Sequence, residues 1–343
     1  MPSDLSRRHR PGPPSRVIPG SVDVRLHFSA RLDAADWQKR HEAGEVPDRW
    51  PYGLHRLARS GEPLRPVPPR LDTLRRIGRR VAGGYDWDRM TIGGDAAVCW
   101  DERAGVPVAT SGVPTLTGVI WLTERGRRHW TDEYARRALG RSIVFVNSPH
   151  QVADLTQEWG VPAKRAHFVN FGVDTDFWRS APGERDGVLI IGNDRHRDHP
   201  TAVAAAVRTG HRVTVVTTNQ NLAVPTTQLS HTSLRKAYAD HAVVALATTP
   251  NRHASGLTVL LEAMACGRPV VATRGGGLEA YLTPETGILV APGDVDGMAD
   301  ALRRLLADPD RCLEMGRTAR AVAETVYSTE ELAKSLNSLM ADL

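Results

Sequence analysis

Residues 254–273 read ASGLTVLLEAMACGRPVVAT and carry the strongest structural signal in the chain. Apolar side chains recur there at helical spacing, which predicts a helix with one buried stripe. The stripe consists of Leu257, Leu260, Leu261, Met264 and Ala265. Gly267 ends this helix and Pro269 prevents its continuation, so the following Val270–Ala272 is predicted to be a buried strand.

A short polar stripe on the same predicted helix indicates a binding site. Ser255, Thr258 and Glu262 lie on a second face at similar spacing. The turn before the helix and the helix N-terminus offer free backbone N–H groups, which suit a phosphate. The carboxylate of Glu262, more than one turn into the helix, suits a pair of neighbouring hydroxyls.

This stretch resembles the donor-site signature of the family 4 glycosyltransferases, the retaining group 1 enzymes of the GT-B fold. The family continues its helix as Leu-Glu-Ala-Met-Ala-x-Gly-x-Pro-Val-Val, and further segments of this chain follow in the family's order. These segments are 171–177, 275–279, 286–290 and 292–294. The resemblance implies an α/β chain with two Rossmann-like domains facing a central cleft, and a C-terminal helix that crosses back to the N-terminal domain.

The resemblance and the composition together predict four parts of the chain. Residues 1–20 are rich in Pro, Ser and Arg and are expected to be a disordered tail. Residues 21–178 form the expected acceptor domain, and residues 179–326 form the expected nucleotide-sugar domain. Residues 327–343 are the helix expected to pack back on the first domain.

Alternating apolar and amphipathic segments predict a parallel sheet in each domain. In the first domain the expected strands are 22–28, 96–100, 117–122 and 142–146. Helical patterns there cover 51–59, 71–81 and 150–159, and residues 30–50 are polar but long for a loop. In the second domain the expected strands are 188–191, 213–217, 243–247, 270–273 and 288–290. Its expected helices are 201–209, 233–238, 257–265, 297–306, 311–326 and 329–343.

Basic residues after the strand 188–191 are candidates for holding the diphosphate, whose negative charge grows as it leaves. The family usually has Gly-Arg-Leu here, followed by a Lys. This chain has Asn193 in place of the Arg, with Arg197 near the Lys position and Arg195 as a replacement for the missing Arg. Arg197 and Arg195 are therefore predicted to be catalytic. The alternative is that both pair with neighbouring aspartates on a surface loop.

The resemblance implies that Glu262 holds the ribose hydroxyls of the nucleotide. The family carries another Glu eight residues earlier, which approaches the donor sugar, and here that position is Ala254. Three explanations remain open: the donor is a deoxy or amino sugar that lacks the contacted hydroxyl, His253 or Asn251 takes over the contact, or catalysis is lost. The first is favoured, since a buried carboxylate without its hydroxyl is costly.

The other donor-binding candidates are mostly backbone positions. The N–H groups around Ser255–Thr258, including Gly256 and Leu257, are predicted to hold the diphosphate. Gly276 and Gly277 follow the strand 270–273 in a turn whose backbone could approach the sugar or the diphosphate, although a simple tight turn is an equal alternative.

Candidates in the first domain are polar residues that follow predicted strands. Asp101 is expected at a strand end facing the cleft and is the third predicted catalytic residue. Glu102, Arg103, Thr123 and Glu124 occupy similar positions. For each of these residues, an ordinary loop charge is the favoured explanation. The His that the family has after a middle strand is missing from its expected place near Leu122-Thr123.

The composition excludes several classes of protein. The chain has 343 residues, a net charge of +5, 41% hydrophobic residues and 24% charged residues, as in a soluble globular protein. Arginine-rich segments raise the charge, but zinc spacing and RNA-binding aromatic patterns are absent from the sequence, so nucleic acid is not expected as a partner. The three scattered cysteines, Cys99, Cys266 and Cys312, are expected to be reduced thiols. Without an apolar run of membrane length, a cytoplasmic protein without integral membrane association is expected.

The favoured function is a retaining, metal-independent transfer of a sugar from a nucleoside diphosphate sugar to an acceptor hydroxyl. The nucleotide sugar is the co-substrate, and neither a cofactor nor a metal is expected. The expected acceptor is a small natural-product scaffold, with a glycan or lipid as alternatives. A GT-B-fold protein that binds a nucleotide sugar or a partner without turnover is the alternative function, because Ala254 replaces a family carboxylate.

Overall fold

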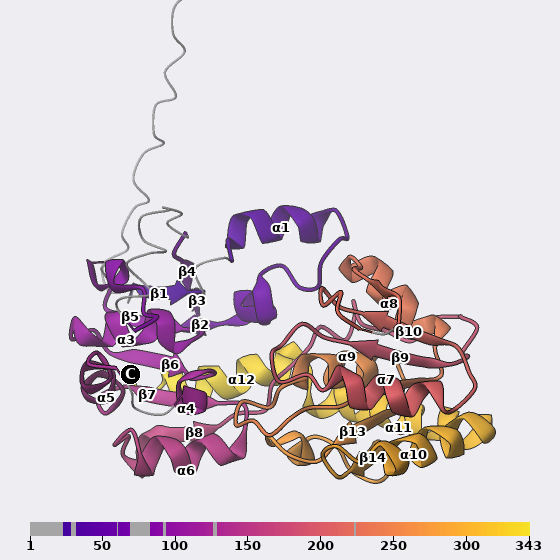
Figure 1. Ribbon diagram of the computed structural model, residues 1–343. Coiled ribbons are helices and arrows are strands. Elements are labelled where there is room, and N and C mark those ends of the chain that lie inside the picture. Colours follow the sequence, from indigo (N-terminus) through magenta and orange to yellow (C-terminus); the bar gives the residue numbers. More distant parts are fainter. Residues whose placement is uncertain are drawn as a thin grey trace, which may run out of the picture.

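The computed structural model describes residues 23–28, 32–59, 61–68, 83–91, 94–125, 129–222 and 224–343. The predicted tail 1–20 and the predicted helix 71–81 lie outside the described residues. Two parallel six-stranded sheets, each flanked by helices, lie side by side as two units (Figure 1). This arrangement confirms the α/β architecture with two Rossmann-like units.

The first sheet has the strand order β4-β1-β5-β6-β7-β8, and all its strands run parallel. Its strands are β1 (Val24–His27), β4 (Arg65–Pro66), β5 (Ala96–Cys99), β6 (Thr115–Gly118), β7 (Ile143–Val146) and β8 (Ala166–Phe168). The central strands β5, β6 and β7 are fully buried, as expected for a sheet covered on both faces.

Short helices surround this sheet, and a small antiparallel pair of strands, β2 (Ala58–Arg59) and β3 (Glu62–Pro63), lies beside it. The helices are α1 (Ala34–Glu42), α3 (Glu102–Thr110), α4 (Leu122–Arg125), α5 (Asp132–Leu139) and α6 (Pro149–Gln157), with 3₁₀ turns η1 (Pro51–Arg56), η2 (Trp87–Thr91) and η3 (Ala163–Arg165). Asp101 begins α3 as its N-cap, because its side chain accepts from the N–H groups of Arg103 and Ala104.

The second sheet has the order β11-β10-β9-β12-β13-β14 and is also parallel. Its strands are β9 (Val188–Ile191), β10 (Val213–Val216), β11 (Thr226–Thr227), β12 (Val243–Leu246), β13 (Val270–Thr273) and β14 (Gly287–Val290). The chain leaves β9 toward β10 on one side and returns to β12 on the other. Ligands of such sheets bind beyond the carboxyl ends of the strands at this reversal of strand order.

Helices cover both faces of the second sheet. They are α7 (His199–Val207), α8 (His231–Asp240), α9 (Leu257–Ala265), α10 (Val295–Ala307), α11 (Pro309–Val326) and α12 (Thr329–Met340), with the 3₁₀ turn η4 (Leu278–Ala280). Helix α7 packs with α10, and α9 packs with α11. The apolar stripe of α9 is buried, as its spacing predicts.

Helix α12 crosses from the second unit to the first, where the chain ends (Figure 1). Asn337 on α12 accepts from the backbone N–H of Ala58 at 3.2 Å, and Arg59 donates to the carbonyl of Leu343 at 2.8 Å. At the start of α12, the Thr329 hydroxyl donates to Asp48 at 3.2 Å. The crossing helix implied by the family resemblance is therefore present.

Two predictions about the first unit were wrong, and one segment that had no assigned element contains a helix. The polar segment 30–50 contains helix α1, which lacks a continuous apolar stripe and is instead begun by the Asp33 side chain, an acceptor from two N–H groups. The helical pattern 51–59 forms a 3₁₀ turn with left-handed residues, Tyr52 and Gly53, followed by strand β2. The strand expected at 117–122 instead runs from Thr115 to Gly118, and helix α4 begins at Leu122.

Candidate functional site

The candidate site lies beyond the carboxyl ends of β9 and β12, where the strand order of the second sheet reverses. The loop after β9 pairs with the loop after β12 through a bridge between Arg197 and Thr248. Backbone hydrogen bonds from Asp198 to Ala247 and from Thr249 to His196, both 2.9 Å long, hold the two loops together. Helix α9 begins at the end of the second loop.

Arg197 carries a guanidinium group whose charge is only partly balanced. Its Nε and Nη1 atoms are shielded from water and have no hydrogen-bond partner among the described residues. Two glycines make room for the side chain: a Cβ at Gly192 would lie 2.2 Å from Nε, and one at Gly256 would lie 2.2 Å from Nη1. Burial lowers the pKa of Arg197 to about 10, against the opposing effect of Asp194. An anion bound here would supply the missing partner.

The N-terminus of α9 lies against this guanidinium. Gly256 is the N-cap residue with a φ of 100°, and the helix has no side-chain cap there. The first N–H groups of α9 and the positive end of its dipole therefore lie beside Arg197. Leu257 is buried at the first helical position, whereas Thr258 is exposed. A helix N-terminus and a guanidinium together form a site for a phosphate-bearing ligand.

The loop before α9 is held by side chains from two directions. Ser255 donates its backbone N–H to Asn251 Oδ1 at 2.9 Å and its hydroxyl to Asp194 Oδ1 at 2.8 Å. A Cβ at Gly276 would lie 2.5 Å from Asn251 Oδ1, so the glycine turn after β13 packs directly against this loop. These contacts bring the predicted residues Ser255, Gly256 and Gly276 together with Arg197.

Glu262 projects from the second turn of α9 and is buried, at 7% exposure. Tyr238 on α8 donates its hydroxyl to Glu262 Oε2 at 3.0 Å. Burial raises the pKa of Glu262 to about 8, although Tyr238 and Arg197 both favour the charged form. Hydroxyl hydrogen bonds from a ligand would favour the charged form of this buried group, and they are stronger in a low-dielectric site than in water.

A carboxylate from the first unit contacts the loop that precedes α9. Glu124, in α4, accepts from Nδ1 of His253 and from the backbone N–H of the same residue, the latter at 2.9 Å. On the other side of the ring, His253 Nε2 lies 3.5 Å from Asp194 Oδ2. Burial alone would lower the pKa of His253, but the two carboxylates raise it above its ordinary value. The imidazolium thus links the two units.

The same cluster contains the groups that a metal ion would use. Ligand atoms of Glu124, His196 and His253 all lie within 4.8 Å of one another. The Nε2 atom of His196 lies 3.7 Å from Glu124 Oε2. Imidazole and carboxylate ligands suit several first-row transition metals. In the structure, His253 and Glu124 are hydrogen-bonded directly to each other, so these two groups are already paired.

Three other predicted residues lie outside this contact network. Arg195 is exposed, and its Nε donates to His196 Nε2 at 3.1 Å. Asp101 is buried at the end of β5, where it caps α3, and burial together with Glu102 raises its pKa to about 7. Gly277 contacts the first unit instead, since a Cβ there would lie 2.5 Å from Ser148 Oγ.

Sequence reasoning missed Tyr238 and Asp194 as site residues. Tyr238 falls at the end of a predicted helix, and its contact with Glu262 spans 24 positions, so the sequence carries no local signal for it. Asp194 is one of the aspartates that neighbour the two arginines in the sequence. Its contacts with Ser255 and His253 form only where two loops about 60 residues apart meet.

Comparison with known proteins supports this description. Residues 184–308 match the family model "Glycosyl transferases group 1". The MMP alpha-(1->4)-mannosyltransferase of Mycolicibacterium hassiacum is 28% identical over 238 residues, 62% of this chain and 57% of that protein. The GDP-mannose-dependent monoacylated alpha-(1-6)-phosphatidylinositol monomannoside mannosyltransferase of Corynebacterium glutamicum is 42% identical over 82 residues, 24% of this chain. That match spans only 22% of the relative's length.

Solved structures match over almost the whole chain. Sucrose-phosphate synthase from Thermosynechococcus elongatus has a TM-score of 0.68 at 16% identity, covering 93% of this chain and 98% of that structure. Anabaena HepE in complex with UDP-glucose has a TM-score of 0.64 at 17% identity, covering 93% and 99%. The chain therefore has the GT-B fold, and residues 184–308 of its second unit are similar to the group 1 glycosyltransferases.

Proposed function

We propose that the protein transfers a sugar from a nucleoside diphosphate sugar to an acceptor hydroxyl, with retention of configuration and without a metal ion. The observation that carries this proposal is the guanidinium of Arg197, whose Nε and Nη1 atoms have no hydrogen-bond partner among the described residues, beside the N-terminus of α9. A leaving diphosphate gains negative charge in the transition state, and preorganised donors of this kind stabilise such charge. Arg195, on the same loop, is proposed to reach the diphosphate as a second cation.

Glu262 is proposed to hold the ribose hydroxyls of the donor nucleotide. Glu262 lies farther along α9 than the proposed phosphate-binding turn at the helix N-terminus. The ribose hydroxyls and the diphosphate would therefore contact different parts of this helix. The Corynebacterium relative is named for GDP-mannose, and Anabaena HepE was solved with UDP-glucose. Both names support a nucleoside diphosphate sugar as the donor class for this chain, and they differ in base and sugar.

The acceptor is proposed to be a small molecule, with Asp101 exchanging a proton with its hydroxyl. Asp101 lies where the strand order of the first sheet reverses, between β1 and β5, which is where a ligand of that unit would bind. A pKa raised to about 7 suits proton exchange near neutral pH. The buried Ala254 offers no polar side chain to the donor, which supports a deoxy or amino sugar.

The proposal is tested with a panel of UDP, GDP and dTDP sugars, including deoxy and amino sugars, incubated with the protein in the presence of EDTA. We expect slow release of nucleoside diphosphate from one donor, and its loss in Arg197→Gln. Trapping with small alcohols and NMR of the glycoside would give the anomeric configuration. Activity that disappears with EDTA and returns with a divalent cation would overturn metal independence, and an inverted product would overturn retention.

A protein that binds a nucleotide sugar without turnover is the second candidate. Two observations favour this candidate: Ala254 replaces the family carboxylate, and Glu124 and His253 are hydrogen-bonded to each other. Binding of a nucleoside diphosphate with unchanged affinity in Asp101→Asn, but no hydrolysis or transfer from any donor, would be the result that supports this function over catalysis.

A further inference from the structure

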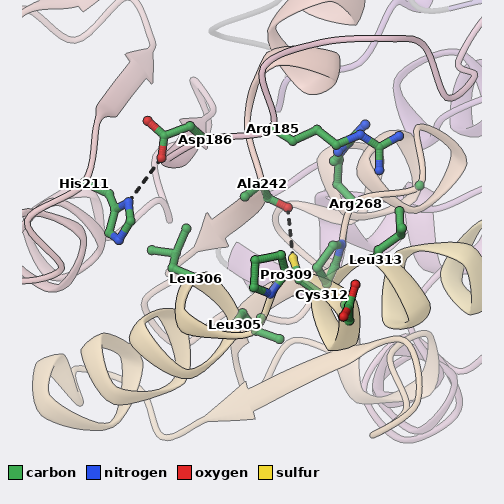
Figure 2. Close-up of a pocket in the computed structure, with 13 residues that line it drawn as sticks. Arg185, Asp186, His211, Ala242, Arg268, Leu305, Leu306, Pro309, Cys312 and Leu313 are labelled. Carbon is green, nitrogen blue, oxygen red and sulfur yellow. Dashed lines mark hydrogen bonds and ion pairs between the residues drawn. The ribbon is translucent and has the colours of Figure 1, made fainter.

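A basic cavity lies at the amino-terminal ends of the strands of the second sheet, opposite the candidate site (Figure 2). Its walls include the residues just before strands β9, β12 and β13, which are Asp186, Ala242 and Arg268, together with the first turn of α11. Because the strands are parallel, this amino-terminal edge lies across the sheet from the loop that contains Arg197. The cavity has a volume of about 340 Å³ and opens to solvent.

Arg268 is the buried charge in this cavity. The residue is only 2% exposed, and its Nε and Nη2 atoms are shielded from water with no hydrogen-bond partner in the described part of the chain. Its backbone is fixed by the N–H bond to Ala263 and by Pro269, so the side chain leaves a rigid turn. A buried and unpaired guanidinium costs free energy in the empty protein.

A second guanidinium, on Arg185, faces the same cavity (Figure 2). Burial, followed by the positive charge of Arg185, lowers the pKa of Arg268 to about 10, so the two cations repel each other. Of the two acidic residues lining the cavity, Asp186 already pairs with His211 Nδ1 at 3.1 Å. The other, Asp310, lies in the first turn of α11.

The surroundings add further positive potential. The first turn of α11, residues 309–313, lines the cavity, so the positive end of an 18-residue helix points toward it. A neighbouring cavity of about 450 Å³ shares Arg185 with the first and adds Arg317 and Arg320. In Arg320, Nη1 donates to the carbonyls of Trp178 and Ala265, both at 2.6 Å, which fixes that side chain in place.

We propose that this cavity is a binding site for a small phosphate-bearing molecule, held by Arg268 and Arg185 near the N-terminus of α11. A phosphate dianion would pair the two guanidinium groups at once and remove their mutual repulsion. The site is separate from the nucleotide site and does not depend on the proposed transfer reaction. Two of its lining residues, Arg185 and Asp186, lie in the segment just before β9.

The test measures phosphate binding in a protein whose proposed nucleotide site is weakened. In Arg197→Gln protein, inorganic phosphate and glycerol 3-phosphate are titrated by calorimetry and by thermal shift at constant ionic strength. We expect saturable binding that weakens at least tenfold when Arg185→Gln is added and is lost with Arg268→Met. Arg303→Gln, which removes an exposed arginine on α10, serves as the control and leaves the affinity unchanged.

The two ligands distinguish a free ion from a phosphate ester. Tighter binding of glycerol 3-phosphate than of phosphate would identify an organic phosphate as the ligand class, and equal binding would identify the free ion. Because Arg185 is exposed, Arg185→Gln remains informative if Arg268→Met does not fold. The proposal is overturned if neither ligand binds, or if their affinity is the same with and without Arg185→Gln.

Discussion

Replacement of Gly256 by alanine tests the packing of the α9 N-terminus against Arg197. The added Cβ would lie 2.2 Å from Arg197 Nη1 and 2.8 and 2.9 Å from the two methyl carbons of Leu246. The φ of 100° adds conformational strain of about 1–2 kcal/mol for a residue with a Cβ. Overpacking of a filled site costs about 1–3 kcal/mol more. We therefore expect Gly256→Ala to destabilise the protein by about 2–5 kcal/mol, because both costs apply.

Differential scanning fluorimetry measures this loss, and Gly293→Ala is the matched control. Gly293 also has a positive φ, 72°, but an added Cβ there would have no neighbour within 4 Å among the described residues. The control thus carries the strain without the clash. At roughly 2–4 °C per kcal/mol, Gly256→Ala should lower the Tm by several degrees more than Gly293→Ala. It should also weaken nucleoside diphosphate binding, since Arg197 must move. Equal Tm losses and unchanged binding in both variants would refute the described packing.

Two further predictions concern Glu262 and the link between the units. Above a pH of about 8, where Glu262 is charged, Glu262→Gln should weaken nucleoside diphosphate binding about 10–100-fold, since a charged hydrogen-bond acceptor is worth about 1.5–3 kcal/mol. Pyrophosphate, which has no ribose, should bind both proteins equally, and an equal loss for both ligands in calorimetry would contradict the ribose assignment. The pKa of His253 is raised, so its charged contacts with Glu124 and Asp194 stabilise the protein in full below a pH of about 6.5. This stabilisation is lost as the pH rises through the raised pKa of His253. The lowered pKa values of the two carboxylates make their contribution present above a pH of about 4. The Tm difference between wild type and His253→Gln should therefore be largest near pH 5–6 and smaller at pH 9; a difference independent of pH would exclude a charged link.

The elements of the second unit could be predicted closely because their signals are local. Strands β9 and β13 and helix α9 begin and end at the predicted residues. Each strand is a short apolar run between polar or glycine residues, and α9 ends at a Gly-Arg-Pro sequence that cannot continue a helix. The buried strands of a parallel sheet are apolar on both faces, which makes them easy to recognise.

The first unit was harder to predict for physical reasons. Helix α1 is held by the Asp33 cap and by a hydrogen bond from the indole of Trp37 to the carbonyl of Pro47, neither of which produces an apolar stripe. In the turn at 51–56, Tyr52 and Gly53 adopt left-handed conformations, which end a regular helix. A Cβ at Gly53 would meet the Thr329 side chain at 2.5 Å, so this turn depends on the distant helix α12.

The site shows the same division between local and long-range information. The sequence placed Arg197 and Glu262 on the right loop and helix, because the order of strand, loop and helix was predictable. It named Glu124 and His253 separately but could not indicate that they meet, since 129 positions separate them and their contact requires the two units to come together. The Tyr238 contact with Glu262 likewise arises only from the packing of α8 against α9.

Calorimetric titration of nucleoside diphosphates into wild type and Arg197→Gln tests the central claim most directly. Arg303→Gln, which removes an exposed arginine paired with Asp300, controls for the change in net charge. We predict that at least one of UDP, GDP and dTDP binds wild type and the control with the same affinity, and binds Arg197→Gln at least tenfold more weakly. Equal affinity in all three proteins would contradict the assignment of the phosphate site to Arg197 and the N-terminus of α9.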